Sequence, residues 1–235
     1  MTTTLPSRKT DRMIELFGRF EDLQTARRAG RRERMVGFLQ RFEEEHYNGL
    51  TTGPVNFNVF RALRIADYEI RHSAFLAWLL DGRGEHRRGT AFLHAFLEAC
   101  GIHYRFGHRE LPIVRTEYRE RCAFIDVMIY TKGGLLVYVE NKVGAPEGDR
   151  QLANEFGDMQ ELGTRLLVPK DRQYAVFLTP HGRPPTTNEA SHWHTLSYRQ
   201  LADAFAALLP GLGSDRLRFI VGDWIEIARE IGDTP

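Results

Sequence analysis

Three strand-like segments that follow one another in the middle of the chain limit its fold more than any other feature. Residues 113–118, 123–130 and 135–143 are rich in Val, Ile, Leu and Tyr, and only short connections separate them. Between the second and third segments, Thr131-Lys132-Gly133-Gly134 predicts a tight hairpin, because glycine adopts the backbone conformations that such turns require. The sequence therefore predicts a three-stranded meander.

Helical periodicity surrounds this meander. Apolar residues recur at helical spacing in residues 11–47, 59–80 (with an interruption near Asp67), 88–100, 149–163, 197–209 and 216–231, and a short buried strand is expected at 174–178. This order predicts a mixed α/β (α+β) fold, in which helices flank a central mixed sheet of four to five strands. The breaker-rich residues 48–58 end an N-terminal helical extension, residues 1–58, and residues 59–235 form the main domain.

Composition excludes several classes of protein. With 42% hydrophobic residues, the chain of 235 residues can bury a sizeable core, which excludes wholesale disorder. No apolar run approaches the ~20 residues of a membrane span, and the first residues lack the apolar stretch of a signal peptide. Two cysteines without a CxxC pair argue against a disulfide scaffold or a cysteine zinc site. We therefore expect a globular, cytoplasmic protein with no membrane partner.

Polar residues interrupt the two strands that the hairpin joins. Asp126 lies within an apolar run, although an unpaired carboxylate is costly in a buried strand. Glu140 and Lys142 follow the next apolar run and share one face of it, whereas Asn141 points to the other face. A loop with an odd number of residues, centred on Gly133, places Asp126 opposite Glu140, whereas a two-residue loop places the carboxylates on opposite faces.

Two carboxylates and one ammonium group would then form a candidate catalytic site. Adjacent carboxylates repel each other unless a cation joins them, and Mg²⁺ prefers oxygen ligands. Such an ion can polarise a phosphoryl oxygen and make hydroxide available near neutral pH, and a lysine can position the attacking water or stabilise the developing charge. These are the requirements of phosphodiester hydrolysis. The alternative is a buried Asp–Lys or Glu–Lys ion pair that only stabilises the hairpin.

The scarcity of lysine supports a specific role for Lys142. Of the 32 basic residues, 28 are Arg and four are Lys, so Arg is the usual cation of this chain. Lys9, Lys132 and Lys170 fall in a tail, a turn and a loop, where either cation would serve. At position 142 a compact ammonium suits a site for water and metal, whereas a broad guanidinium does not.

These motifs resemble those of the PD-(D/E)XK nuclease superfamily, which has the fold of restriction endonucleases. Ile125-Asp126-Val127 is similar to the first acidic motif, with Ile125 in place of proline, and Val139-Glu140-Asn141-Lys142 is similar to the E-x-K motif. Further segments resemble a bacterial branch with an upstream helix motif; they are 69–81 (containing Glu69, His72 and Ser73), Gln151-Leu152 and Phe177-Leu178-Thr179-Pro180. The resemblance covers about residues 66–205.

The resemblance implies a role for each matched residue of the two main motifs. Asp126 and Glu140 would bind Mg²⁺, for which Mn²⁺ would substitute, and the backbone carbonyl of Asn141 would be a further ligand. Lys142 would be the catalytic lysine. The implied activity is that of a metal-dependent phosphodiesterase, an endonuclease.

The resemblance also implies roles for two residues on helices. Glu69 would be an extra carboxylate of the same metal and catalytic site, although it could instead form a surface ion pair with Arg64 or Arg71. Gln151 would help to position the water or the phosphate. Related branches often have tyrosine four residues after this glutamine, where the present chain has Glu155.

Other polar residues have alternative interpretations. Glu117, on the first strand of the meander, could reach the site or could pair at the surface with Arg115 or Arg119. Arg121 could contact phosphate. The arginine-rich residues 27–34 form either a solvated helix face or an arm that contacts phosphate.

The leading hypothesis is a Mg²⁺-dependent nuclease that hydrolyses DNA, with a role in phage defence or a mobile element as the resemblance implies. Two alternatives stay open: an RNA-cleaving effector, and a non-catalytic nucleic-acid-binding or assembly module that keeps the fold. A net charge of only +1 means that nucleic-acid affinity must come from local clusters of arginine and from the metal. A homodimer is one candidate assembly, because two-fold symmetry suits the cutting of two strands.

Overall fold

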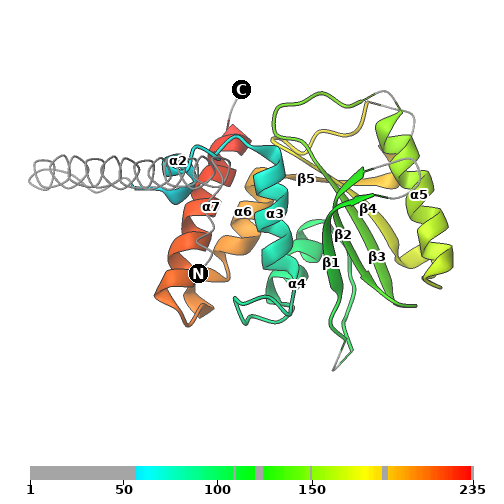
Figure 1. Ribbon diagram of the computed structural model, residues 1–235, viewed down its shortest axis with the longest axis horizontal. Coiled ribbons are helices and arrows are strands. Elements are labelled where there is room, and N and C mark those ends of the chain that lie inside the picture. Colours follow the sequence, from blue (N-terminus) through cyan, green and yellow to red (C-terminus); the bar gives the residue numbers. More distant parts are fainter. Residues whose placement is uncertain (1–56, 108–109, 120–123, 149, 187–189, 234–235) are drawn as a thin grey trace, which may run out of the picture. The chain divides into compact units, whose positions relative to one another are not determined.

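The computed structural model describes residues 57–107, 110–119, 124–148, 150–186 and 190–233 (Figure 1). Nearly all of the expected N-terminal extension lies outside these residues, as do Arg121 and the arginine-rich residues 27–34. The domain boundary and the interpretations of those arginines therefore stay predictions.

A five-stranded mixed sheet forms the centre of the described part, with the strands in the order of the sequence. The strands are β1 (Ile113–Arg119), β2 (Phe124–Thr131), β3 (Leu135–Asn141), β4 (Gln173–Thr179) and β5 (Trp193–Ser197). β1, β2 and β3 form the predicted antiparallel meander, whereas β3, β4 and β5 run parallel. The predicted mixed sheet flanked by helices is confirmed.

Six α-helices are described. They are α2 (Val59–Ala62), α3 (Glu69–Leu80), α4 (Ala91–Ala99), α5 (Gln151–Arg165), α6 (Tyr198–Ala206) and α7 (Asp215–Asp233). The segment expected as one interrupted helix over 59–80 is two separate helices. Asn58 caps α2 by accepting from the N–H groups of Phe60 and Arg61, and the chain then turns through Arg64, whose φ is 54°. This left-handed residue ends the helical path before α3 begins.

Helices cover both faces of the sheet (Figure 1). On one face, Val127, Val137 and Val139 pack into a core with side chains of α3, α4, α6 and α7. On the other face, Leu136 and Tyr138 pack with α5. Successive strand residues point to opposite faces, so the continuous apolar runs of β2 and β3 fit a sheet that is buried on both sides.

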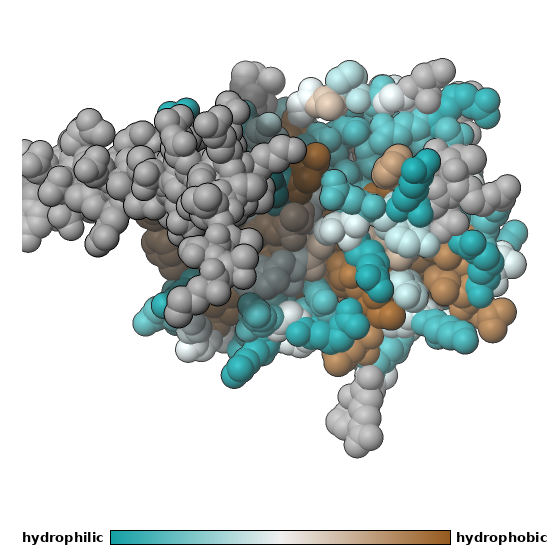
Figure 2. Space-filling view, in the orientation of Figure 1, coloured by the Kyte–Doolittle hydropathy of each residue, from teal (hydrophilic) through white to brown (hydrophobic). Residues whose placement is uncertain are grey.

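The outer surface is of mixed polarity. Figure 2 shows hydrophobic residues interspersed among hydrophilic ones over the sheet and α5. None of the described helices combines the length and the apolar character needed to cross a membrane.

Candidate active site

Asp126 and Glu140 lie opposite each other on neighbouring strands. The β2–β3 ladder pairs Val127 with Val139 in a register centred on Gly133, and one further step along that register brings Asp126 to Glu140. The connection is the odd loop 132–134, in which Gly133 has a φ of 71°. Glycine adopts this left-handed conformation without strain. The predicted odd hairpin loop is therefore confirmed, and it brings the two carboxylates together.

Glu140 is the centre of a buried polar network. Its side chain is only 2% exposed, and its Oε1 lies 2.7 Å from Nζ of Lys142. The same oxygen accepts a hydrogen bond of 2.5 Å from Nε2 of Gln151, the first residue of α5. The N–H of Lys142 donates to the carbonyl of Leu178 at 2.9 Å, which extends the β3–β4 pairing by one residue. Lys142 is thus held at the carboxyl end of a parallel strand, where α/β proteins commonly bind ligands.

Burial raises the pKa of both carboxyl groups. Burial and then the charge of Asp126 raise the pKa of Glu140 to about 7, against the opposing effect of Lys142. Burial raises the pKa of Asp126 to about 6, although its Oδ2 accepts the Asn141 N–H at 2.8 Å. Burial lowers the pKa of Lys142, but the charge and hydrogen bond of Glu140 and the charges of Glu69 and Asp126 together outweigh this effect, so the pKa is raised overall. The site therefore holds more acid than one ammonium group neutralises.

Glu69 faces the site from the first turn of α3. Its Oε2 accepts the N–H of Val143 at 2.8 Å, and its Oε1 lies 3.7 Å from Nζ of Lys142. In the described residues it forms no ion pair with Arg64 or Arg71, so the surface-pair alternative is wrong. Glu69 therefore lies beside Lys142 and Val143, the two residues that follow β3.

Asn141 anchors the end of β3 to the helices on the opposite face of the sheet. Its Nδ2 donates to Oγ of Ser73 at 3.0 Å and lies 3.3 Å from the carbonyl oxygen of Glu69. Its Oδ1 accepts from the hydroxyl of Tyr198 at 2.8 Å. The middle residue of the E-x-K motif is thus fully buried, and it fixes the strand end against α3 and α6.

His72 fixes α3 from its inner face. Nε1 of Trp224 donates to Nδ1 of His72 at 3.2 Å, which leaves the proton on Nε2 to reach the carbonyl of Ala66 at 2.8 Å. Burial lowers the pKa of His72, so the neutral ring that this arrangement requires is favoured. His72 and Ser73 therefore hold the helix that carries Glu69.

The sequence did not assign a role to Glu155, which the structure places beside Gln151. Nε2 of Gln151 donates to Oε1 of Glu155 at 2.9 Å as well as to Glu140, while Oε1 of Gln151 accepts the N–H of Gly148 at 3.1 Å. Glu155 is 1% exposed, and its Oε2 has no hydrogen-bond partner in the described part of the chain. Burial and then the charge of Glu140 raise its pKa to about 9. This burial could have been recognised in the sequence, because Glu155 is a charged residue on the inward face of an amphipathic helix.

Comparison with known families agrees with this geometry. A family model of the PD-(D/E)XK nuclease superfamily matches residues 57–214, more than half of the chain. The chain belongs to the PD-(D/E)XK nuclease superfamily. Neither a curated protein nor a solved structure matches it. The mixed sheet flanked by helices is the restriction-endonuclease-like fold of this superfamily.

The type of ligand in the site fits the divalent metals that PD-(D/E)XK nucleases generally use. Within the described ranges, no three His, Cys, Asp or Glu side chains are grouped as a ready metal-binding cluster. Asp126 and Glu140 supply two carboxylates, and Mg²⁺ is usually held by one or two carboxylates while keeping several waters. Their raised pKa values reflect burial and the negative charges of neighbouring carboxylates, an unfavourable effect that a cation would relieve. The donor set is therefore suited to a hard divalent cation.

Glu117 lies on the far side of Asp126 from Glu140 in this superfamily sheet. It falls between the β1–β2 pairs Thr116–Val127 and Tyr118–Ile125, so it faces Asp126, and its φ is 47°. Its side chain is exposed, and in the described residues it forms no ion pair with Arg115 or Arg119. The charge of Glu117 contributes to raising the pKa of Asp126. The two interpretations of Glu117, as a member of the site and as a surface ion-pair partner, stay predictions.

Proposed function

We propose that this protein is a Mg²⁺-dependent endonuclease that hydrolyses DNA phosphodiester bonds. The observation that supports this most strongly is the excess of acid around one ammonium group. The charges of Glu140, Glu69 and Asp126 all act on Lys142. A structural ion pair needs one acid for each base, and every further buried carboxylate costs stability. A bound cation would neutralise this excess of negative charge.

Asp126 and Glu140, with the backbone carbonyl of Asn141, would hold the cation. When bound, a divalent ion neutralises negative charge on a phosphate and lowers the pKa of water, and Mn²⁺ is expected to substitute for Mg²⁺. The Asn141 N–H occupies Oδ2 of Asp126, which fixes the rotamer of that carboxylate. The side chain of Asn141 holds the strand end from behind.

Lys142 would act directly on the reacting groups. Its side chain is 12% exposed, so the ammonium is largely shielded from water but is open on one side. A desolvated ammonium can stabilise negative charge on the phosphate during attack, and it can hold the attacking water by a hydrogen bond. Its backbone N–H is fixed by the Leu178 carbonyl, so the direction of the side chain is set by the sheet.

Glu69 and Gln151 complete the proposed site from two helices on opposite faces of the sheet. Glu69 lies against Lys142 and the Val143 N–H, where it positions the lysine and adds negative charge for a cation. Gln151 holds Glu140 through its amide and would position the water or the phosphate. Both residues are thus proposed members of the catalytic site, and Glu69 is also a proposed metal ligand.

The choice of DNA, a two-fold dimer, a role in phage defence or a mobile element, and a cytoplasmic location stay predictions. The chemistry of the site addresses the phosphate, so it does not by itself separate DNA from RNA.

A cleavage assay tests this function. Its substrates are labelled single- and double-stranded DNA and RNA of one sequence, in buffer that contains Mg²⁺, Mn²⁺ or EDTA. We expect metal-dependent cleavage of DNA by the wild-type protein and by Lys132→Met, which changes an exposed turn lysine. Asp126→Asn should leave less than about 1% of this rate. Cleavage of RNA alone would show that the substrate is RNA and not DNA. Binding without cleavage of any substrate, or full activity of Asp126→Asn, would contradict the proposal.

A further inference from the structure

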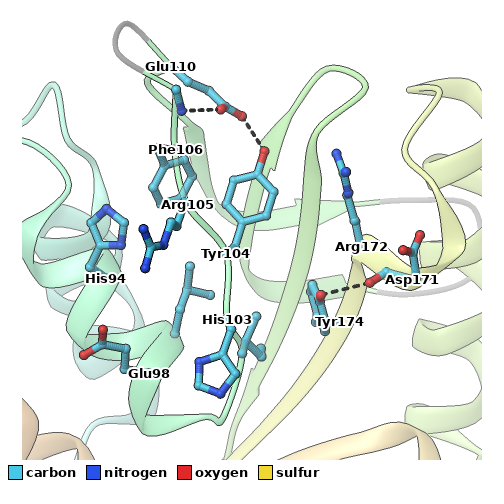
Figure 3. Close-up of a pocket in the computed structure, with 13 residues that line it drawn as sticks. His94, Glu98, His103, Tyr104, Arg105, Phe106, Glu110, Asp171, Arg172 and Tyr174 are labelled. Atoms are coloured by element: carbon cyan, nitrogen blue, oxygen red, sulfur yellow. Dashed lines mark hydrogen bonds between the residues drawn. The ribbon is translucent and has the colours of Figure 1, made fainter.

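A cavity of about 1220 Å³ (Figure 3) is lined by residues at the start of β4, at the other end of the sheet from the candidate active site. One wall is formed by α4 and the loop 102–107, and the other by Asp171, Arg172 and Tyr174 at the start of β4. The β3–β4 ladder runs from Leu136–Gln173 at this end to Asn141–Leu178 at the active-site end. The two sites are therefore separated by about 17 Å of strand.

Aromatic rings form a fixed surface on the first wall. The ring of Phe106 packs edge to face against Tyr104 and His94, with centroids 5.0 and 5.1 Å apart. Glu110 holds this arrangement, because it accepts the Tyr104 hydroxyl at 2.7 Å and the N–H of Gly107 at 2.9 Å. The loop thus presents aromatic groups that are already ordered, which lowers the entropy lost when a planar ligand binds.

Two arginines line the cavity, one on each side of the Tyr104 ring (Figure 3). Arg105 and Arg172 are both exposed, and neither forms an ion pair with an acidic side chain that the structure describes. Glu110 is occupied by its hydrogen bonds to Tyr104 and Gly107. The other lining carboxylates are those of Glu98 and Asp171, and both are exposed.

We infer that this cavity binds a nucleotide. Arginine pairs readily with phosphate oxygens, which assigns the phosphate to Arg172, beside the ring of Tyr104. Nucleic-acid bases stack on aromatic side chains, which assigns the base to the surface of Tyr104 and Phe106. Carboxylates accept hydrogen bonds from ribose hydroxyls, so Glu98 or Asp171 would hold the sugar and would favour a ribonucleotide.

The charged and aromatic residues of the cavity fit a nucleotide better than they fit inorganic phosphate or an uncharged aromatic ligand. A purely anionic ligand such as inorganic phosphate would make no use of the rings and would be repelled by Glu98 and Asp171. An uncharged aromatic ligand would make no use of the guanidinium groups. Nucleotide binding here does not depend on nuclease activity, so either proposal can fail without the other.

Isothermal titration calorimetry in EDTA tests this inference without any contribution from a bound metal. The ligands are AMP, GMP, CMP and UMP, their deoxy forms, inorganic phosphate, and short RNA and DNA strands. The variants are Arg172→Ala and Phe106→Ala, with circular dichroism as a check of folding. The control is Arg229→Ala, which removes an exposed arginine on α7.

We expect at least one ribonucleotide to bind about tenfold more tightly than inorganic phosphate, and Arg172→Ala to weaken that binding by about tenfold. The control should bind as the wild type does. Binding of RNA strands alone, with the same dependence on Arg172, would support the site and identify a strand as the source of the nucleotide. The inference is overturned if no nucleotide or strand binds, if phosphate binds equally well, or if Arg172→Ala leaves binding intact.

Discussion

Nζ of Lys142 lies 2.7 Å from Oε1 of Glu140, two residues earlier on the same strand end. This pair is not an isolated salt bridge, because Asp126 faces Glu140 across the hairpin and Glu69 approaches Lys142 from α3. One ammonium group thus serves several carboxylates in a buried place.

Lys142→Met should reduce metal-dependent cleavage by at least about 100-fold, because the ammonium that stabilises the phosphate charge is lost. Lys142→Arg should restore little of this rate, since a planar guanidinium does not fit the position of a compact ammonium. Initial rates on a fluorescent oligonucleotide measure both effects. Lys132→Met is the matched control, and wild-type rates in Lys142→Arg would show that any cation serves.

The free energy of unfolding should fall as pH rises in metal-free buffer. The pKa values of Asp126, Glu140 and Glu155 rise from ordinary values of 3.8, 4.5 and 4.5 to about 6, 7 and 9 in the fold. Between these limits the folded state binds more protons than the unfolded state. The contribution of these neutral carboxyl groups to the free energy of unfolding is fully present at about pH 4. It is lost progressively as the pH rises to about 9.

Urea unfolding at several pH values, with and without Mg²⁺, measures this effect. Each proton retained by the folded state steepens the fall by about 1.4 kcal/mol per pH unit. Mg²⁺ should flatten the fall by binding the ionised carboxylates, and the double variant Glu140→Gln/Glu155→Gln should flatten it without metal. Stability that rises between pH 5 and 8 in EDTA would contradict the assigned directions of these pKa shifts.

Glu155→Leu should make the protein more stable and less active. The substitution removes a buried carboxyl group whose Oε2 has no partner in the described residues, which should add about 1 kcal/mol to the free energy of unfolding. It also removes an acceptor of the Gln151 amide, so Glu140 is held less firmly and the cleavage rate should fall. Thermal melting and cleavage rates test the two parts. Asn154→Leu, on the exposed face of α5, is the control, and it should change the melting temperature and the cleavage rate less than Glu155→Leu does.

Tyr198→Phe should destabilise the fold by about 1–3 kcal/mol, because Oδ1 of the buried Asn141 would lose its hydrogen-bond donor. The strand end would stay in place through Ser73, so cleavage should fall less than it does in Lys142→Met. Urea unfolding gives the loss of stability. An unchanged midpoint would mean that this hydrogen bond does not anchor β3.

Local sequence rules predicted the hairpin well. Gly-Gly in the turn allowed an odd loop with a left-handed residue, and strand alternation then placed Asp126 opposite Glu140 and put Lys142 on the same face as Glu140. The strands of the meander were predicted because their apolar runs are long. The fifth strand, β5, was not located individually, since its five residues include His194 and Thr195 and carry little apolar signal.

The sequence did not reveal contacts between residues that are far apart in the chain. The bond of Asn141 to Tyr198 joins residues 57 positions apart, and that of Trp224 to His72 joins residues 152 apart. Such contacts depend on how α3, α6 and α7 pack on the sheet, which helical periodicity does not determine. Glu155 appeared only as a difference from a motif, and its burial beside Gln151 became evident from the placement of α5.

We propose that the Asp126–Glu140–Lys142 group catalyses phosphodiester hydrolysis. The test is the initial rate of Mg²⁺-dependent cleavage by Glu140→Gln, which keeps the shape of the side chain and removes its charge. The wild type and Glu226→Gln are measured beside it, because Glu226 is an acid on α7 that pairs with Arg61. We predict a rate below about 1% of wild type for Glu140→Gln and a normal rate for Glu226→Gln. A wild-type rate in a correctly folded Glu140→Gln protein would contradict the claim.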